Sequence, residues 1–517
     1  MSKMRRRSLA FFAALFIALF SVLPMTALAS SNDGTKESEL SFLSEKGTKI
    51  GVATGTIQDM IVNTLYPDAD IEYIEKYQGY LSVSQGKLDA YVYDKTQMLL
   101  AIENGQKGVK VLDETIAEPS KVAVGISKTP VIPDLKKNLN SFISKIKADG
   151  TLDDMYERWS IKGNYEMPKF DEPSEIKYHI RVATTGDVPP YSFYQNNEIT
   201  GYDIELMRRF GAWLGADIKF VIYDWDSIVP ALQANKADII AGNLNVTSER
   251  QEAIDFSDTL YEIEHGVMVQ DTGTEAKQGF FESIADSFEK TFIREDRYKL
   301  FLSGILTTIT ITVFSIIFGT ALGFLIYMCC RKGKKAPNLI ARIFFALIHG
   351  MPVVVLLMIL YYIIFAKAAV SGTVVAIIAF TLVFASGVFG MLKSGVGAVD
   401  KGQEEAALSL GYSDRRSFYR IILPQALPHF LPAFKGEVVS LLKATAIVGY
   451  IGVQDLTKMG DIVRGRTYDA FFPLIAVAIF YFALGGLLIF LVSRIEIKID
   501  PKKRKRKKLL KGVKADA

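Results

Sequence analysis

Long apolar runs mark the carboxyl-terminal part of the chain. Residues 300–330, 343–366, 368–392 and 471–493 contain no Asp, Glu, Lys or Arg, and His349 is the single interruption in the second run. These runs of 31, 24, 25 and 23 residues can each cross about 30 Å of hydrocarbon at about 1.5 Å per residue. The pattern predicts four membrane-spanning helices.

A fifth, weaker candidate lies at residues 425–452. It contains Lys435, Glu437 and Lys443, and charges inside a span are costly unless they face other helices or lie near the ends. We therefore expect a five-span, all-α region with these three side chains turned inward or placed at its edges.

The preceding part alternates between short apolar runs and helical patterns, as parallel sheets flanked by helices do. Two such stretches occur, at residues 48–127 and 178–271. In sheets of this kind ligands lie at the carboxyl ends of strands, near helix N-termini. The strands expected are 49–53, 90–93 and 122–126 in the first stretch and 180–183, 218–222, 239–241 and 266–269 in the second, with helices at 202–214 and 227–234.

The net charge of +4 hides an uneven distribution. Residues 1–29 carry +4 and residues 501–517 carry +8, which leaves 4 − 4 − 8 = −8 for residues 30–500. An acidic body between two basic ends excludes a nucleic-acid surface running along the whole chain.

The amino-terminal block has the pattern of a secretory signal peptide. A basic start precedes an apolar stretch, and Ala27-Leu28-Ala29 comes before Ser30, so residues 1–29 are expected to direct export and to be cleaved. An uncleaved anchor is the alternative. The two cysteines, Cys329 and Cys330, are adjacent and give the exported part no disulfide framework.

Loop charges give the expected orientation of the spans. The segments 331–342 and 393–420 and the tail after Arg494 are rich in Lys and Arg, and five spans put all three on one side. That side is the cytoplasm, so the α/β part lies outside. The basic run Lys502–Lys508 would then be attracted to anionic lipid.

The second basic loop carries the most specific motif. Glu405-Ala406-Ala407 is followed by Gly411, then by Ile421 and Leu423-Pro424. The pattern predicts a short helix, a glycine turn and a second short helix that stops near Pro424.

This spacing resembles the EAA motif of ATP-binding-cassette importer permeases, and the resemblance covers about residues 300–494. It implies that Glu405, Ala406, Ala407, Gly411, Ile421 and Pro424 couple the chain to a cytoplasmic ATPase. His349-Gly350-Met351-Pro352 resembles a start seen in amino-acid permeases, with His349 in place of the family's arginine.

Nucleotide chemistry is expected on another polypeptide. The sequence contains no G-x-x-x-x-G-K-[ST] phosphate loop, no C-x-x-C and no H-E-x-x-H. We expect no catalytic residues, no metal site and no cofactor bound by this chain, with ATP supplied through the partner ATPase. The resemblance implies a dimer of that ATPase and a second permease copy or sibling.

Both α/β stretches resemble periplasmic polar amino-acid-binding proteins of type II. Residues 178–271 resemble the first lobe, through Pro189-Pro190-Tyr191-Ser192-Phe193 and Gly201-Tyr202-Asp203-Ile204. Residues 48–127 resemble the second lobe, and residues 138–160 resemble the closing helices. The resemblance implies a two-lobed solute-binding domain fused to a permease.

The family order is first lobe, second lobe, closing helices, and here the last two come first. We therefore expect a circular permutation joined through residues 161–177; two incomplete copies are the alternative. The domains expected are 1–29, 38–165 (second lobe and closing helices), 178–271 (first lobe), 272–297 (linker), 298–495 (permease, with coupling loop 403–424) and 496–517 (cytoplasmic tail).

A permutation of this kind carries a mechanical expectation. An ordinary member crosses between its lobes twice, whereas this chain should cross once, with the other crossing opened into two ends. Closure of the lobes would then act directly on the tether at residues 271–297. Two covalently continuous crossings would contradict the permutation in this form.

The resemblance also implies the ligand contacts. Arg250 would clasp the α-carboxylate of an amino acid, as a bidentate cation does, and Asp94 would accept from its ammonium group. Thr56, after Gly55, stands at an expected helix N-terminus, which favours an anion. Plain helix capping is the alternative for Asp94 and Thr56.

The expected walls for the ligand side chain are aromatic. Trp225 matches one wall of the family, with core packing as its alternative. Val188 stands where the family has the second aromatic wall, and Tyr191 is close by. Asn243 and Asn245 stand where the family prefers Gly and Ser or Thr, which leaves the side-chain class of the substrate open.

Two classes of function follow. The first is an ATP-driven importer that takes up an amino acid across the cytoplasmic membrane, with its binding domain outside; the resemblance implies a polar amino acid. The second is an amino-acid-gated channel or sensory receptor. The channel gives no reason for the motif at 405–424, and a sensor needs a cytoplasmic output domain where only a basic tail follows.

Overall fold

The computed structural model of the protein describes residues 38–499 except 75, 131, 171–174, 272–279, 334, 369, 468, 470 and 471. The body described below begins at Phe42. The expected signal peptide at 1–29 and the basic run at 502–508 lie outside the described residues.

The first α/β subdomain is built on a five-stranded sheet of order β2-β1-β3-β15-β4. Tyr80, Leu88 and Tyr91 pack with Met98 in its core. Its elements are η1 (Ser41–Ser44), β1 (Lys49–Val52), α2 (Ile57–Leu65), β2 (Asp70–Tyr73), α3 (Lys76–Ser84), β3 (Ala90–Asp94), α4 (Lys95–Glu103), β4 (Val109–Val111) and β15 (His265–Gln270).

The second α/β subdomain has a five-stranded sheet of order β11-β7-β12-β6-β13 and a three-stranded sheet of order β10-β9-β8. Trp159, Phe193 and Phe210 are buried in its core. Its elements are β6 (Gly125–Ile126), α5 (Leu135–Ala148), α6 (Thr151–Tyr156), η2 (Glu157–Ile161), β7 (Tyr178–Thr184), β8 (Asp187–Val188), β9 (Ser192–Gln195), β10 (Glu198–Thr200), α7 (Tyr202–Leu214), β11 (Ala216–Ile222), α8 (Trp225–Gln233), β12 (Ile239–Ile240), α9 (Ser248–Ala253) and β13 (Asp255–Phe256).

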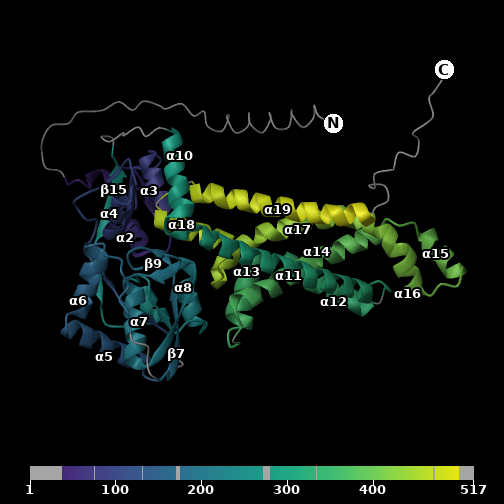
Figure 1. Ribbon diagram of the computed structural model, residues 1–517, viewed down its shortest axis with the longest axis horizontal. Coiled ribbons are helices and arrows are strands. Elements are labelled where there is room, and N and C mark those ends of the chain that lie inside the picture. Colours follow the sequence, from purple (N-terminus) through teal and green to yellow (C-terminus); the bar gives the residue numbers. More distant parts are fainter. Residues whose placement is uncertain are drawn as a thin grey trace, which may run out of the picture. The chain divides into compact units, whose positions relative to one another are not determined.

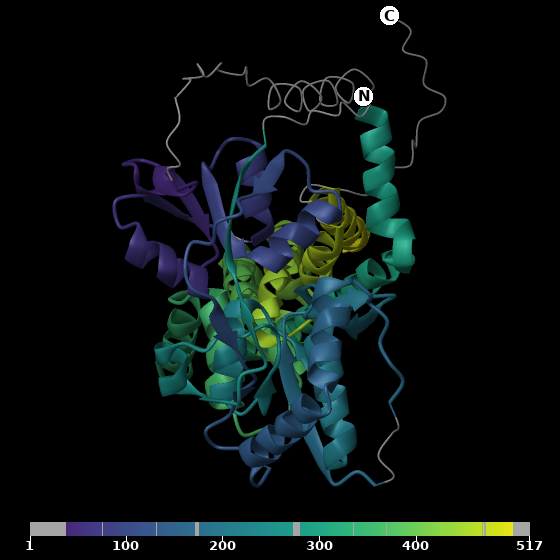
Figure 2. The same cartoon turned by 90° about the vertical axis from the view of Figure 1, so that its left-hand side faces the viewer.

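Most of the expected strands and helices form close to their expected bounds, but the strand expected at 122–126 is divided into β5 (Ser120–Val122) and β6, which lie in different sheets. The sheets are also not purely parallel. β15 pairs antiparallel with β3 and β4, and β6 pairs antiparallel with β12 and β13. The antiparallel pairs arise because the two stretches of sequence exchange strands. Each of these strands comes from the other stretch of sequence, and it enters its sheet in the direction opposite to the strands beside it. In Figure 2 the teal strand β15 runs among the purple and blue elements of the first subdomain.

The chain crosses between the two subdomains twice. β5 (Ser120–Val122) leads from β4 to β6, and β14 (Tyr261–Ile263) leads from β13 to β15; the two pair antiparallel, with Tyr261 opposite Val122. The expectation of one covalent crossing is therefore wrong, and so is the permutation in the form that requires it. The two ends lie instead in the first sheet, before β1 and after β15.

The exchange of strands joins the two stretches into one fold. β6 belongs to the first stretch of sequence and completes the second sheet, while β15 belongs to the second stretch and completes the first sheet. Two incomplete copies folding separately would each keep their own strands, which these sheets do not do.

The region after residue 280 is helical. Three of its helices are long and apolar enough to span a membrane, and bent pairs raise the possible number to five within the described residues. Helices α11, α14, α17 and α19 pack side by side (Figure 1). The elements are α10 (Phe280–Phe288), η3 (Glu289–Ile293), η4 (Arg294–Asp296), α11 (Tyr298–Cys330), α12 (Lys335–His349), α13 (Val353–Met358), η5 (Ile359–Ile364), α14 (Gly372–Gly397), α15 (Lys401–Ser409), α16 (Asp414–Ser417), η6 (Phe418–Ile422), α17 (Leu423–Ala444), η7 (Thr445–Ile451), α18 (Leu456–Thr467) and α19 (Phe472–Ile499).

The second apolar run is not one straight helix. A bend of 105° separates α12 from the helix at 353–364, so the continuous span expected at 343–366 is corrected. Pro352 takes an extended ψ of 142° and caps the second helix. A proline there has no N–H for a continuous ladder, so the helix stops and restarts.

The helix expected to stop near Pro424 continues instead. The backbone stays helical from Asp414 through α17, and Pro424 lies in the first turn of α17. The π-helical turn η6 directly precedes it, and a widened turn is a common way to accommodate a local disruption of the α-helical ladder.

Charges in the helical region find partners. Lys435 Nζ lies 2.6 Å from Glu496 Oε2, and the Glu496 side chain is 4% exposed. Arg331 pairs with Glu404 and Asp414 at 2.7 Å each, and its guanidinium lies over the Phe418 ring. The end of α11 is thereby fastened to α15 and α16.

His265 ties the second crossing to the first subdomain. Gln58 Nε2 lies 3.1 Å from His265 Nδ1, and His265 Nε2 lies 2.7 Å from Ser120 Oγ. The ring is fully buried, and burial lowers the pKa of His265 to about 4. Gln58 donates to Nδ1 in this arrangement, so the neutral ring carries its proton on Nε2.

The burial of His265 predicts acid sensitivity. The unfolded chain binds a proton at His265 near pH 6.5 and the folded chain only near pH 4. Above pH 6.5 the ring is neutral in both states, and His265 does not lower the free energy of unfolding. As the pH falls from 6.5 toward 4, only the unfolded chain binds the proton, so the free energy of unfolding decreases by up to about 3 kcal/mol. In thermal unfolding of the full chain in detergent, H265Q should remove this part of the pH dependence. Equal slopes for both proteins between pH 4 and 6.5 would contradict it.

Candidate functional site

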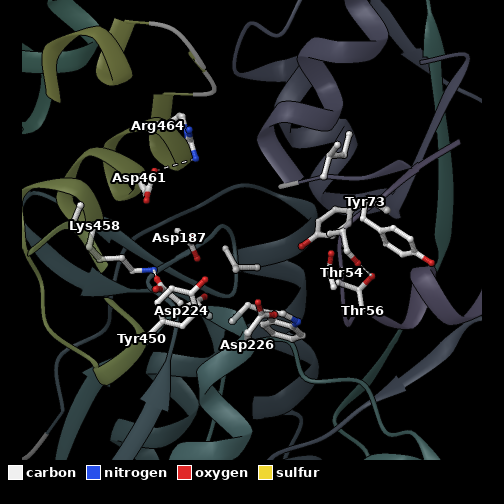
Figure 3. Close-up of a pocket in the computed structure, with 17 residues that line it drawn as sticks. Thr54, Thr56, Tyr73, Asp187, Asp224, Asp226, Tyr450, Lys458, Asp461 and Arg464 are labelled. Carbon is white, nitrogen blue, oxygen red and sulfur yellow. Dashed lines mark hydrogen bonds and ion pairs between the residues drawn. The ribbon is translucent and has the colours of Figure 1, made fainter. Parts of the chain in front are cut away.

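A cavity of about 480 Å³ opens between the two α/β subdomains and α18. This volume lies in the range of about 300–1,000 Å³ common for small-molecule sites. Ala53, Thr56 and Tyr93 line it from the first subdomain, and Val188 and Trp225 line it from the second. The helical region contributes Ala446, Tyr450, Lys458, Asp461 and Arg464 (Figure 3).

A second, smaller cavity of about 20 Å³ shares part of this wall. Thr56, Tyr93, Val188 and Trp225 line both cavities, and Asp94, Asn243 and Asn245 line only the smaller one. A volume of this size holds about one water molecule. The ligand-sized space is therefore the larger cavity, and the smaller one extends it toward Asp94.

Asp94 and Thr56 both cap helices. Asp94 ends β3 and accepts from the backbone N–H of Gln97, and Thr56 accepts from that of Asp59. The helix-capping alternative is thus confirmed for both, and a contact with ligand stays a prediction. Asp94 is 1% exposed, and burial raises the pKa of its carboxyl above the usual range, opposed by hydrogen bonds from Asn243 and Gln97.

Asn243 links the two subdomains at this point. Its Nδ2 donates to Asp94 Oδ2 at 2.9 Å, and its backbone N–H donates to Asp203 Oδ2 at 2.8 Å. Asn243 adopts a positive φ of 56°, a conformation that Asn tolerates better than most residues. Burial raises the pKa of Asp203 to about 7.

Sequence reasoning missed Asp203 as a member of this network. Asp203 lies in the motif Gly201-Tyr202-Asp203-Ile204, but the motif assigned no function to this residue. Its carboxylate fixes the backbone that presents Asn243.

Arg250 uses its donors on backbone carbonyls. Its Nη1 donates to Asn245 O and its Nη2 to Gly55 O, each at 2.9 Å, and the guanidinium lies over the Trp225 ring. Burial lowers the pKa of Arg250 to about 10. The structure therefore brings Arg250, Gly55, Asn245 and Trp225 together across the two subdomains, and Arg250 is not among the described residues lining either cavity.

Tyr191 stands behind the cavity wall. It is fully buried, and its ring stacks on Tyr261 with centroids 5.3 Å apart. The structure does not place it among the described lining residues, whereas Val188, its neighbour in the motif, lines both cavities.

The helical side of the cavity was also missed. Lys458 Nζ lies 2.7 Å from Asp224 Oδ1, and Arg464 pairs with Asp461. Lys458 and Arg464 stand outside the apolar runs, in a segment that periodicity treated as a loop. The sequence did carry a signal for them. Their segment is expected on the side opposite to the basic loops, and basic residues are uncommon on that side.

The predicted coupling residues lie on an exposed loop of the helical region. Glu405 and Ala406 in α15 are exposed, Ala407 is buried, and Gly411 takes a positive φ of 80°. Leu408 and Leu410 are 48% and 78% exposed. Ile421 in η6 is half-buried and Pro424 in α17 is exposed. The first helix and the glycine turn thus form where the pattern predicts them.

Two kinds of known protein match this chain. The profile of the bacterial extracellular solute-binding proteins, family 3, matches residues 180–445, which is 266 of 517 residues and more than half of the chain. The chain belongs to this family. The match begins in β7 of the second subdomain and runs into the helical region.

Transport permeases match this member of family 3 as well. The putative glutamine transport system permease protein GlnP of Rickettsia felis is 34% identical over 203 residues, 38% of this chain and 92% of the relative. The arginine transport system permease protein ArtQ of Bacillus subtilis is 32% identical over 203 residues, 38% of this chain and 91% of the relative.

Among solved structures, a crystal structure of an amino acid ABC transporter with histidines is 29% identical. It covers 43% of this chain and 99% of its own, with a TM-score of 0.37. From the sequence matches to GlnP and ArtQ, the solute-binding protein described here is also homologous to amino-acid transport permeases, and these relatives are named as transport proteins and not as enzymes.

The Asn243 network predicts a graded loss of stability. N243G keeps the positive φ but loses the hydrogen bond to a buried carboxylate, and should destabilise the folded protein by about 2 kcal/mol. N243A also strains the backbone and should cost about 1 kcal/mol more. Thermal unfolding of the full chain gives both values. Equal stability of the two variants would contradict the backbone part, and no loss in N243G would contradict the network.

Proposed function

We propose that this chain is the fused substrate-binding and permease subunit of an ATP-driven importer for an amino acid. The observation that carries the proposal is that one chain matches both a solute-binding family and amino-acid permeases. A solute-binding family covers more than half of it, and amino-acid permeases match it over 92% of their own length.

The two α/β subdomains are the lobes of the binding domain in this proposal. Their cavity of about 480 Å³ is the ligand site, with Trp225 as one wall. Asp94 accepts from the ligand ammonium group in the extension of the cavity, and Arg250 turns from the carbonyls of Gly55 and Asn245 to the ligand carboxylate. The order of the lobes follows from opening the chain between β15 and β1, which are both in the first sheet.

The helical region is the membrane permease with five spans. The α/β domain lies outside the cytoplasmic membrane, and the basic loops and carboxyl terminus lie in the cytoplasm. ATP hydrolysis belongs to a separate ATPase dimer that binds the loop at 403–424, where the exposed Leu408 and Leu410 offer an apolar face. The ion pairs of Arg331 connect this loop to α11, so a movement of α15 is transmitted to a spanning helix.

Ligand binding can be tested with one substitution that keeps the fold. Asn caps a helix as well as Asp does, so D94N should preserve α4 while removing the charge that holds the ammonium group. We expect calorimetry of the full chain in nanodiscs to find one or a few binding amino acids among the twenty. D94N should weaken that binding at least tenfold.

The exposed substitution D68N is the matched control and should change nothing. Failure of every amino acid to bind the wild-type chain would overturn the proposal. An ion current opened by an amino acid in the absence of the ATPase would instead favour the channel.

Coupling to the ATPase can be tested separately. E405K reverses a charge on the exposed face of α15 and should leave the amino-acid affinity unchanged. With the ATPase partner present in proteoliposomes, it should lower amino-acid-stimulated ATP hydrolysis and uptake at least tenfold. E103K, an exposed reversal in α4, is the control. Normal uptake in E405K would show that this loop does not couple the subunits.

A further inference from the structure

The second α/β subdomain lies against the helical region through β8 and β9, which contact α18, and through one short segment around α8. We call residues 223–236, which comprise α8 and its two flanks, the docking segment. Tyr223 Oη lies 3.0 Å from Tyr361 Oη, and Lys236 Nζ donates to the backbone carbonyls of Phe365 and Ala368. Both ends of α8 therefore make polar contacts with the helical region.

Apolar side chains fill the space between these contacts. Ile228 and Leu232 of α8 belong to the same buried cluster as Leu357, Val448 and Ile451 of the helical region. A cluster that continues from one region into the other is what a stable interface requires. The contact is therefore more than a set of surface charges.

Two glycines of the helical region fit the docking segment closely. A Cβ atom at Gly449 would lie 2.5 Å from Asp224 Oδ2, and one at Gly452 would lie 2.7 Å from Cε1 of Tyr223. Gly452 also has a positive φ of 71°, but for Gly449 no such backbone demand is present. Asp224 therefore supplies a reason for a glycine at position 449.

An ion pair closes the same contact at the edge of the cavity. Lys458 Nζ lies 2.7 Å from Asp224 Oδ1, with side chains 6% and 31% exposed. Both residues line the large cavity, and Asp224 directly precedes Trp225 (Figure 3). A cation buried this deeply needs its partner, so the pair favours the docked arrangement.

We propose that the docking segment keeps the second subdomain bound to the helical region of the same chain, fastened by Asp224 and Lys458, while the first subdomain moves to open and close the cavity. The proposal rests on the proposed function for its role in uptake. The crossings at β5 and β14 are then the points at which the first subdomain turns. The partner of the docking segment is its own chain and not a second copy.

A zero-length cross-link tests which chain is the partner. Carbodiimide joins a carboxylate to an amine in direct contact, so it should join Asp224 to Lys458 in the full-length chain. Mixing isotopically heavy and light chains before reconstitution should give heavy–heavy and light–light peptides in mass spectrometry. Mixed peptides as the main product would overturn the proposal. This readout needs neither ligand nor ATPase, so it stands even if the proposed transport function fails.

Activity variants test whether the contact matters for uptake. D224K and K458D should each lower amino-acid-stimulated ATP hydrolysis at least tenfold, and the double variant D224K/K458D should recover to within about threefold of wild type. G449A should uncouple hydrolysis while retaining amino-acid binding. G436A is its control, because a Cβ there meets no atom within 4 Å. Full coupling in G449A or in D224K would overturn the proposal.

Discussion

The pairing of β5 with β14 is the constraint on which the α/β domain depends. These two short strands are the connections between the subdomains, and they run side by side with Tyr261 opposite Val122. Because each continues into the sheet of the other half, neither sheet is complete without both crossings. His265, at the end of one crossing, is hydrogen-bonded to Ser120 at the start of the other. The two crossings are therefore linked by side chains as well as by backbone hydrogen bonds.

Local patterns predicted the elements better than their connections. Strands such as β7 and β11 and the helix α7 form where hydrophobic periodicity places them, because that periodicity reflects which face of each element is buried. The exchange of β6 and β15 is a long-range pairing. It leaves no trace in the period of either strand, and for this reason the number of crossings was predicted wrongly.

The candidate site shows the same limit in its chemistry. Asp94 and Thr56 cap helices because each stands directly before the first residue of a helix, a local signal that the sequence displays. That Arg250 bonds to Gly55 depends on two segments 195 residues apart. Tyr191 was predicted as a ligand contact close to Val188, but its ring stacks on Tyr261, and Val188 is the residue that lines the cavity. The two residues are three positions apart, and the motif does not specify which of their side chains faces the cavity.

In the helical region, Pro352 and Pro424 affect their helices differently, and the charged Lys435 lies as expected. Pro352 breaks its helix with a sharp bend, whereas Pro424 lies within a helix that continues. A proline near the start of a helix loses little, since its missing N–H would be unpaired there in any case. Lys435 fits the expectation for a charge within a span, because Glu496 of another helix neutralises it.

Both ends of the α/β domain lie in the first sheet, and this has consequences for the stoichiometry of the domain and for how far it can move. Only the eight residues 272–279 separate Asp271, just after β15, from the start of α10, and at about 3.5 Å each they can span at most about 28 Å. Under the proposed function, a binding domain on so short a connection stays at a high effective concentration near the permease part of its own chain. Supply of ligand would then depend on how often the attached domain reloads, and not on how many free binding proteins the cell makes.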